Sequence, residues 1–323
     1  MIQILKARAS RVMAKTGVLL LKYSGYYNGY WAPWRGDMFS WAQSKGLHIL
    51  PVHYYTPVPD TATVAIDHSE ARFPVIGNAD LAQALSLWEK VVTPVRKKFV
   101  EISQRENTSE GRFCYHGAPY APGDAELLYG WIVSRKPRRI VEIGSGFTTL
   151  LINEAIADAK QDDPGYSCRF QCIEPYPPEY LSPRPEHMSE MIDLPLQGMN
   201  LELFQNLEPG DLLFIDSTHV LAYGSDVVYE YLKILPNLKP GVIVHIHDIF
   251  LPYDYPDTWI KDLHFFWNEQ YLLAGILQGG DRYVPLFPMH QLFREHHDRL
   301  KALVPNLDES QLGPASFWLR VNG

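Results

Sequence analysis

The sequence has few cysteines and no long apolar run. Its 323 residues include three cysteines, Cys114, Cys168 and Cys172. This number is small, and because it is odd the cysteines cannot all pair, so we expect no disulfide framework. No stretch approaches the roughly 18 apolar residues that a membrane-spanning helix requires. Internal repeats and low-complexity tracts are absent too. We therefore expect a globular, cytoplasmic protein with no integral membrane span.

The sequence has no excess of positive charge either. The chain has 29 Lys and Arg against 37 Asp and Glu, which gives a formal net charge of -8. This balance provides no general attraction to the phosphates of nucleic acids, so we expect no nucleic-acid partner. Hydrophobic residues make up 46% of the chain, which is enough for a sizeable core without disulfides or structural metals.

The N-terminus is basic, although the chain as a whole is acidic. Four Lys and Arg residues within 6–15 precede the apolar run 18–21, an order that superficially resembles a secretory signal peptide. The run ends at Lys22 after four residues, which is too short for a signal core. We expect a solvated helix packed on its own domain, with a basic amphipathic helix touching a membrane surface or a partner as the alternative.

Two regions differ in their pattern. Residues 1–110 are rich in aromatic and turn residues, and their clear periodicity is confined to 79–102, where we expect a helix with a bend at Pro94. From residue 111 onward, apolar runs alternate with helical patterns. We therefore expect an accessory, partly helical region that acts as a lid or as the dimerisation element of a homo-oligomer, followed by one α/β domain at 111–323.

The second region predicts a largely parallel sheet with helices on both faces. Strands are expected at 139–143, 169–174, 191–196, 211–216, 242–248, 283–286 and 316–320. Helices are expected at 125–134, 148–159 and 226–234.

Acidic residues and glycines stand at the ends of these expected strands. They are Glu142 with Gly144 and Gly146, then Glu174, Asp216 and Asp248. In a doubly wound sheet, ligands bind at the carboxyl ends of the strands. Glycines let the backbone turn tightly and approach a ligand, and an acidic residue after the second strand suits the two hydroxyls of a ribose. The pattern predicts a cofactor that contains a nucleoside.

Three details favour a sulfonium cofactor over a nicotinamide dinucleotide. The dinucleotide fingerprint needs a third glycine, and Thr149 stands in its place. Glu174 comes 30 residues after Gly144, whereas about 20 are expected for a dinucleotide. Glu142 would repel a pyrophosphate, but it suits a cationic amino-acid moiety.

These segments resemble four motifs of the class I S-adenosylmethionine-dependent methyltransferases. Residues 141–146 resemble motif I, and Glu174 resembles the ribose-binding acid of the family. Residues 210–219 resemble the fourth-strand motif, and together with 245–250 they resemble the bacterial branch that methylates small molecules. Each motif alone is weak, but four in the right order are fairly specific.

The resemblance covers about residues 111–323. It implies a Rossmann-like, doubly wound, mostly parallel seven-stranded sheet of order 3-2-1-4-5-7-6, with an antiparallel last strand. It implies S-adenosylmethionine as the cofactor and places residues 197–199 on its adenine side. The implied cofactor-binding residues are Glu142, Gly144, Ser145, Gly146, Thr148, Glu174 and Asp216.

Candidate catalytic residues follow the fourth and fifth strands. They are Asp216, His219, His247 and Asp248. In one mechanism His219 or His247 is a general base oriented by an aspartate, because the ordinary pKa of histidine, near 6.5, suits proton removal. In the other, Asp216 and Asp248 bind a divalent metal that lowers the pKa of a substrate hydroxyl. We favour the metal-free base.

The metal mechanism rests on similarity to catechol-type methyltransferases. In those enzymes an Asn or Asp follows the fifth-strand acid, whereas Ile249 stands there in this chain. A nearby histidine would have to supply the third ligand, which favours a transition metal. If the strand stays extended, His247 and Asp248 point to opposite sides, and His245 shares a face with His247.

Three further features are interpreted from their position. His245 lies deep in a strand and is expected to be structural. Residues 251–256 follow the fifth strand and are expected to form a substrate loop. A solvated helix is expected to carry His290, His296 and His297.

The sequence therefore predicts S-adenosylmethionine-dependent methyl transfer to a small molecule, at an oxygen atom. One alternative is a metal-binding enzyme of the same fold with another reaction, such as hydroxylation. The other is a cofactor-binding module without catalysis.

Overall fold

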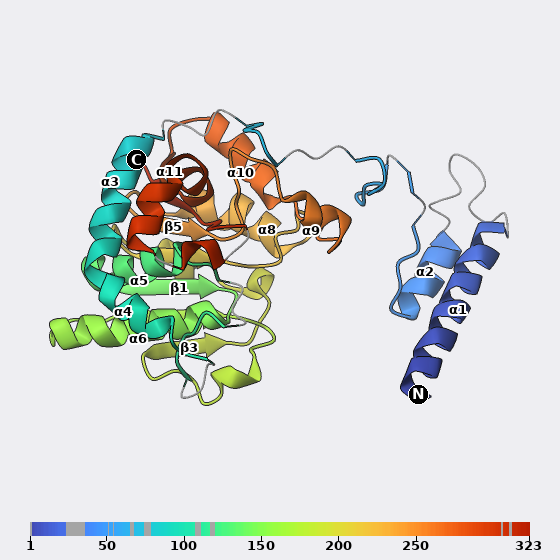
Figure 1. Ribbon diagram of the computed structural model, residues 1–323, viewed down its shortest axis with the longest axis horizontal. Coiled ribbons are helices and arrows are strands. Elements are labelled where there is room, and N and C mark those ends of the chain that lie inside the picture. The colour runs from blue at the N-terminus through green and yellow to red at the C-terminus, as the bar shows by residue number, and fades with distance from the viewer. Residues whose placement is uncertain are drawn as a thin grey trace. The chain divides into compact units, whose positions relative to one another are not determined.

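The computed structural model divides the chain into two units, Met1–Ala65 and Ile66–Gly323 (Figure 1). The structure describes residues 2–23, 36–50, 52–53, 55–64, 68–73, 79–106, 111–116, 120–304, 306–309 and 312–323. Among the helices in these ranges, none combines the length and the apolar character needed to span a lipid bilayer.

The first unit contains the helices α1 (Ile2–Tyr23) and α2 (Gly36–Ser44). From residue 6 to residue 20, every side chain of α1 is exposed. In α2 the side chain of Ala42 is buried. The ring of Phe39 stacks on that of His48, with the ring centroids 5.2 Å apart.

A seven-stranded sheet of order β3-β2-β1-β4-β5-β7-β6 forms the centre of the second unit. Its strands are β1 (Arg139–Ile143), β2 (Arg169–Ile173), β3 (Met188–Ile192), β4 (Leu212–Ile215), β5 (Ile243–Ile246), β6 (Tyr283–Pro288) and β7 (Phe317–Val321). The first five pair in parallel, and β7 is antiparallel to both β5 and β6. The predicted strand order is confirmed.

The third strand lies earlier than the sequence indicated. β3 ends at Ile192, whereas the expected strand covered 191–196. Pro195 precedes a short 3₁₀ turn at Leu196–Gly198. Because proline has no N–H to donate to a strand ladder, it is confined to sheet edges and turns.

The helices of the second unit flank this sheet (Figure 1). They are α3 (Leu81–Val92), α4 (Arg96–Ile102), α5 (Asp124–Arg135), α6 (Phe147–Asp162), α7 (Glu202–Gln205), α8 (Asp226–Tyr229), α9 (Asp257–Lys261), α10 (Glu269–Gln278) and α11 (Met289–Leu303). A 3₁₀ turn at Thr93–Val95 joins α3 to α4, so the predicted bend at Pro94 is confirmed. A π-helical turn at Glu230–Ile234 continues α8.

Two hydrophobic cores cover the two faces of the sheet. Ile140 and Leu212 belong to the core that contains α3, α5 and α6. Their neighbours Val141 and Leu213 belong to the core that contains α8 and α10. Successive side chains of a strand point to opposite faces. Glu142 has the same parity as Ile140, and its side chain therefore faces α6.

The accessory region ends earlier than the change in sequence pattern near residue 110. The boundary between the units follows Ala65, and α3 packs into the first core of the second unit with Trp88 fully buried. Gly130 of α5 permits this approach, because a Cβ atom there would lie 2.6 Å from the carbonyl oxygen of Val91. Residues 79–102 therefore pack with the sheet, since α3 presents an apolar face to it.

Candidate functional site

Four strand ends form one row at the carboxyl edge of the sheet. The parallel register aligns Ile143 with Ile173 and Ile215, and Ile215 with Ile246. The residues that come directly after these strand ends are Gly144, Glu174, Asp216 and His247. The register therefore brings together residues that lie about a hundred positions apart in the sequence.

Gly144 makes the close approach between two of these strand ends. Its φ angle is 88°, and an added Cβ atom would overlap the carbonyl oxygen of Asp216. The N–H of Gly144 donates to the carbonyl oxygen of Ile173 at 3.0 Å. Only glycine adopts this backbone conformation at no steric cost while leaving room for the neighbouring chain.

Glu142 holds the glycine loop against α6. It is fully buried, and its carboxylate accepts hydrogen bonds from the hydroxyls of Thr148 at 2.7 Å and Thr149 at 2.8 Å. Burial raises the pKa of Glu142 to about 8, although the two threonine hydroxyls lower it. The side chain lines neither of the cavities described next. In this arrangement the carboxylate of Glu142 fixes the glycine loop against the first turn of α6, and its predicted role at the cofactor stays a prediction.

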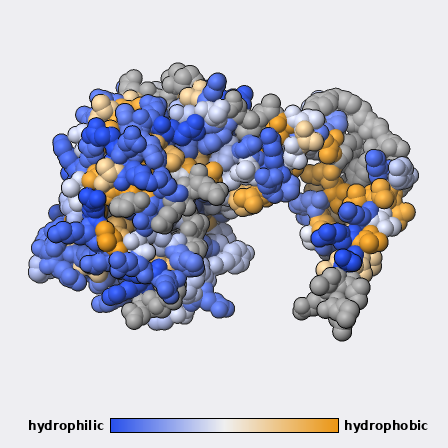
Figure 2. All heavy atoms as spheres, in the orientation of Figure 1, coloured by the Kyte–Doolittle hydropathy of each residue, from blue (hydrophilic) through white to orange (hydrophobic). Residues whose placement is uncertain are grey.

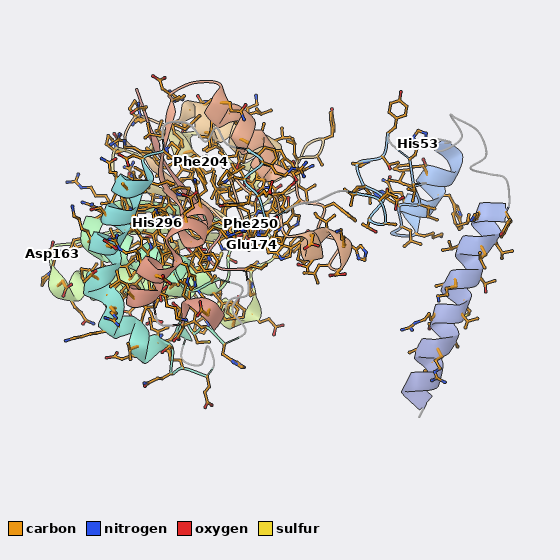
Figure 3. The ribbon with its side chains drawn as sticks, turned by 45° about the horizontal axis from the view of Figure 1, so that its top comes forward. His53, Asp163, Glu174, Phe204, Phe250 and His296 are labelled. Atoms are coloured by element: carbon orange, nitrogen blue, oxygen red, sulfur yellow. The ribbon has the colours of Figure 1, made fainter. Side chains whose placement is uncertain are left out.

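A cavity of about 400 Å³ opens at this edge of the sheet. Glu174 and Asp216 line it, together with Gln197 from the loop after β3. The carboxylate of Glu174, which is labelled in Figure 3, accepts hydrogen bonds from the N–H groups of Ser145 at 3.2 Å and Tyr176 at 2.8 Å. The loops after β1 and β2 therefore meet at one acidic side chain, and the loop after β3 lines the same cavity.

A second cavity of about 180 Å³ shares Asp216 with the first. Tyr120, Ser145 and His247 also line it. The hydroxyls of Tyr120 and Ser145 are buried and have no hydrogen-bond partner within the described part of the chain. The second cavity therefore has polar groups with unused hydrogen-bonding capacity beside Asp216.

His219 connects three carboxylates at the rim. Its Nδ1 lies 2.8 Å from Oε2 of Glu269, and its Nε2 lies 3.3 Å from Oδ1 of Asp216 and 3.6 Å from Oδ2 of Asp248. One donor atom each of Asp216, His219 and Asp248 falls within 4.8 Å of the others. Two of the four predicted catalytic residues, His219 and Asp248, therefore adjoin Asp216, which both cavities share.

The backbone turns sharply at both ends of this cluster. His219 has a φ angle of 59° and Asp248 one of 54°, which is the left-handed region that residues other than glycine seldom adopt. Each such conformation costs about 1–3 kcal/mol and persists where the surrounding structure enforces it. Strained residues of this kind gather at functional sites.

His247 joins the same cluster because β5 ends before it. Its Nδ1 lies 3.4 Å from Oδ1 of Asp248 and 3.6 Å from Oδ1 of Asp216. The sequence predicted opposite directions for His247 and Asp248 if the strand stayed extended. The strand stops at Ile246, and the left-handed turn at Asp248 brings both side chains to the same side.

Charges in the cluster balance one another. Burial alone would raise the pKa of Asp216, but His247 and His219 hold it well below its usual range. Burial likewise opposes the charged form of His219, yet Asp216 and Glu269 raise its pKa well above the ordinary value. Asp248 and Asp216 do the same for His247. The carboxylates therefore favour a cation at the histidine nitrogens, which a proton or a metal ion can supply.

Glu269 was not identified from the sequence. It stands at the start of α10, 50 positions after His219, and no spacing rule connects the two residues. Its own neighbour in the interior is Glu230, whose Oε2 accepts a hydrogen bond from the hydroxyl of Ser217 at 3.2 Å. Burial and then the Glu269 carboxylate raise the pKa of Glu230 well above its usual range. Glu269 is therefore backed by a second buried acid.

The remaining predicted histidines lie away from this cluster. His245 stacks on Phe214 with the ring centroids 4.1 Å apart and shares a face with His247, as predicted. His290, by contrast, is buried in α11, and its Nδ1 lies 3.2 Å from the carbonyl oxygen of Pro314. Its predicted place on a solvated surface is wrong, because it lies on the buried side of that helix.

Residues 251–256 are not an open loop. All six are buried, and the carbonyl oxygen of Pro252 accepts hydrogen bonds from the N–H groups of Arg72 and Phe73. This segment packs against 68–73, and its predicted role as a substrate loop stays a prediction.

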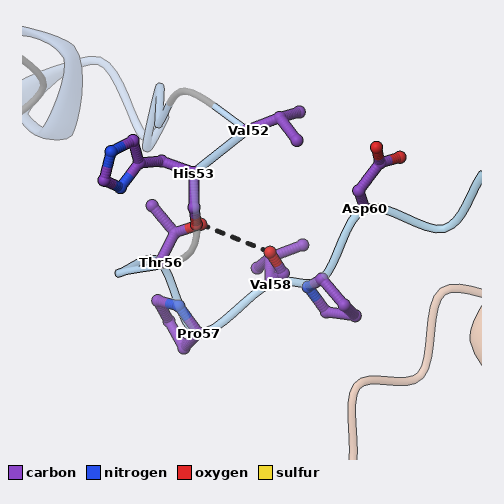
Figure 4. A pocket seen from close by; sticks show the side chains of 7 residues that line it. Val52, His53, Thr56, Pro57, Val58 and Asp60 are labelled. Atoms are coloured by element: carbon purple, nitrogen blue, oxygen red, sulfur yellow. Dashed lines mark hydrogen bonds between the residues drawn. The ribbon is translucent and has the colours of Figure 1, made fainter. Parts of the chain in front are cut away.

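A separate hollow occurs in the first unit, within the segment 52–60 (Figure 4). The hydroxyl of Thr56 lies 2.6 Å from the carbonyl oxygen of His53 and 3.3 Å from that of Val58. All residues that line this hollow come from one short stretch of chain.

Comparison with known proteins adds to this geometry. Residues 141–249 match the family described as a methyltransferase domain. An uncharacterized protein of Archaeoglobus fulgidus is 27% identical over 165 residues, which span 49% of this chain and 73% of that protein.

Among solved structures, one similar chain is a putative protein-L-isoaspartate O-methyltransferase of Plasmodium falciparum in complex with S-adenosyl-L-homocysteine. The identity is 12% over 53% of this chain and 78% of that one, with a TM-score of 0.28. A likeness at this level carries no argument about function. The family match stands on its own, and it includes β1 with its glycine loop, β2, β4 and β5. Residues 141–249 are therefore similar to a methyltransferase domain, and the sheet has the strand order that the resemblance to class I S-adenosylmethionine-dependent methyltransferases implied.

Proposed function

We propose that the protein transfers the methyl group of S-adenosylmethionine to a hydroxyl oxygen of a small molecule. The observation that carries this proposal is the position of Asp216, which lines both cavities and adjoins His219 and His247. A cofactor that extends through both cavities would pass Asp216 and present its methyl group next to groups that move protons.

The larger cavity suits the nucleoside part of the cofactor. Glu174 would accept hydrogen bonds from the ribose hydroxyls, since a carboxylate has capacity beyond the two N–H groups it already binds. Gln197 and Leu196 also line this cavity, and an adenine ring bound there would contact them. The unpaired hydroxyls of Tyr120 and Ser145 would bond the amino-acid moiety in the smaller cavity.

The chemistry is a direct displacement at the methyl carbon. The acceptor oxygen forms a bond to that carbon, the carbon–sulfur bond breaks, and sulfur keeps the electron pair to give neutral S-adenosylhomocysteine. The hydroxyl proton must leave, and the neutral form of His247 in the smaller cavity, which the positive charge of the bound cofactor would favour, would receive it. Asp216 and Asp248 would stabilise the imidazolium that results, because each has an oxygen within 3.6 Å of its Nδ1.

The donor set of Asp216, His219 and Asp248 also fits a divalent metal ion. One imidazole nitrogen and two carboxylates are ligands that first-row transition metals accept. Glu269 would hold the Nδ1–H of His219, so that Nε2 keeps its lone pair for a metal. A bound divalent ion would lower the pKa of a hydroxyl coordinated to it. The position of these three residues supports the metal mechanism as strongly as the metal-free base, which the sequence had favoured.

Transfer of radiolabelled methyl groups would test the proposal. The full chain is incubated with labelled S-adenosylmethionine and a panel of phenols, catechols and aliphatic alcohols. In parallel samples the protein is treated with EDTA before this incubation, and Mn²⁺, Co²⁺ or Mg²⁺ is then added back. We expect label on an oxygen of at least one acceptor, loss of transfer with EDTA, and recovery with a transition metal.

One variant and the EDTA treatment separate the roles at the site. Asp248→Asn should weaken Mn²⁺ binding and transfer together, while S-adenosylhomocysteine binding stays within about twofold, because Asp248 lines neither cavity. Full transfer in EDTA would exclude the metal mechanism and leave His247 as the base. Intact S-adenosylhomocysteine binding without transfer to any acceptor would support a binding module, and added oxygen in the product would support a hydroxylase.

A further inference from the structure

Helix α1 is strongly basic and contains no Asp or Glu. Its basic residues are Lys6, Arg8, Arg11, Lys15 and Lys22. The first acidic residue of the chain is Asp37, although the net charge of the whole chain is -8. The five positive charges of this helix are therefore not offset by any acidic residue within it.

From residue 6 onward, four of the five basic side chains and five of the seven large apolar ones of α1 occupy two neighbouring sides, and Lys6, Val18 and Leu21 fall outside these two groups. At 3.6 residues per turn, Arg8, Arg11, Lys15 and Lys22 fall within an arc of about 60°. The apolar residues Val12, Met13, Leu19, Leu20 and Tyr23 fall within a neighbouring arc of about 120°. A helix with these two faces lies with its axis along a boundary between water and an apolar phase.

The apolar arc is open to solvent within the first unit. Met13 is 67% exposed, Leu20 69% and Tyr23 78%. Figure 2 shows apolar and hydrophilic surface side by side on this unit. Apolar surface of this kind, rimmed by basic residues, marks a site of interaction.

We propose that α1 binds the surface of a membrane that contains anionic lipids. The apolar arc would enter the boundary between headgroups and acyl chains, and the Lys and Arg side chains would extend to the lipid phosphates. Pairing with α1 of a second copy is disfavoured, because it would bring five positive charges on each helix together with no acid to offset them. Anionic lipid supplies both the negative charge and the apolar phase that this helix matches.

Membrane binding would hold the methyltransferase domain at a lipid surface. The proposal depends on α1 alone and not on the acceptor or the metal ion. Its test is therefore separate from the methyl-transfer experiments, and binding of S-adenosylhomocysteine serves as a check that each variant is folded.

Sedimentation of the full chain with lipid vesicles would test this proposal. We expect binding to vesicles of phosphatidylcholine and phosphatidylserine at 3:1, weak binding to pure phosphatidylcholine, and release by NaCl. The triple variant Arg8→Gln, Arg11→Gln, Lys15→Gln should lower the partition coefficient about 100-fold, since each basic residue contributes about fivefold near an anionic surface. Met13→Gln with Leu20→Gln should also lower it, at unchanged charge.

A matched control removes three exposed cations from the second unit. The variant Arg96→Gln, Lys97→Gln, Lys233→Gln has the same net charge as the α1 triple variant and should bind vesicles within about threefold of the original chain. Equal losses in both triple variants would overturn the assignment to α1. So would equal binding to neutral vesicles, or no vesicle binding together with a dimer that the α1 variants dissociate.

Discussion

His219 shows how one loop residue acquires a fixed orientation. A left-handed backbone conformation directs its ring toward the strand ends, and Trp267 packs beside it with the ring centroids 4.3 Å apart. The carboxylate of Glu269 then determines which ring nitrogen faces outward, because it accepts a hydrogen bond from Nδ1–H at 2.8 Å. Orientation by such a partner is a common support for a metal-binding histidine.

Substitution of Glu269 by glutamine tests whether its carboxylate orients the His219 ring for metal binding. An amide oxygen accepts the Nδ1–H of His219 less strongly than a carboxylate does, so we expect Mn²⁺ affinity to fall about 10- to 100-fold. Affinity for S-adenosylhomocysteine should change less than twofold, because Glu269 lines neither cavity. Calorimetric titration of both ligands measures these effects.

The control for this variant is another buried glutamate. Glu126 accepts hydrogen bonds from the hydroxyl of Tyr115 at 2.7 Å and from the N–H of Gly123 at 2.6 Å. Glu126→Gln should therefore leave Mn²⁺ binding unchanged. If the two variants lost metal affinity equally, Glu269 would have only a general effect on stability.

At the scale of elements, the contact between α3 and α5 attaches the segment before residue 111 to the sheet. Two glycines in helices allow this contact to be measured. Gly130 is buried, and a Cβ there would lie 2.6 Å from the carbonyl oxygen of Val91, whereas Gly275 of α10 is exposed with no atom within 4 Å of such a Cβ. The same substitution should therefore have opposite effects at the two sites.

Gly130→Ala should destabilise the protein and Gly275→Ala should stabilise it. We expect the free energy of unfolding to fall by about 1–3 kcal/mol for the first, because the backbone of α3 must move away. It should rise by about 0.5–1 kcal/mol for the second, since alanine favours a helix over glycine. Urea denaturation of both variants measures the difference, and stabilisation by Gly130→Ala would show that α3 is not held close to α5.

Elements with strong local signals were predicted well from the sequence. Arg139–Ile143 forms a strand where the sequence predicted one, because a short apolar run ends there in a glycine turn. The bend at Pro94 follows from proline chemistry alone. The third strand was misplaced because its residues are half exposed, which leaves a weak apolar pattern.

Over the whole molecule, the sequence located one side of the site and missed the other. Asp216 and Asp248 are recognisable because each follows an apolar strand, and parallel strands end at one edge. Glu269 reaches the same place through long-range packing, which leaves no mark in local spacing. The place of α3 in the core was missed for the same reason: amphipathic periodicity predicts a buried face but not its partner.

Buried acids also give the folded state a dependence on pH. Burial raises the pKa of Glu142 from 4.5 to about 8. Between these values the folded chain holds a proton that the unfolded chain releases, so the contribution of Glu142 to stability is complete below pH 4.5 and is lost as the pH rises through 8. The loss amounts to about 1.4 kcal/mol per pH unit.

Glu142→Gln removes this dependence. The amide keeps contacts with the hydroxyls of Thr148 and Thr149 but does not titrate, so the variant should gain about 2–3 kcal/mol relative to the original chain between pH 5.5 and 7.5. Urea denaturation at the two pH values measures the change, with Glu202→Gln at an exposed position as the control. Parallel curves for the Glu142→Gln variant and the original chain would mean that Glu142 is ionised in the folded state. The carboxylate would then lie closer to water or to a cation than its two threonine partners imply.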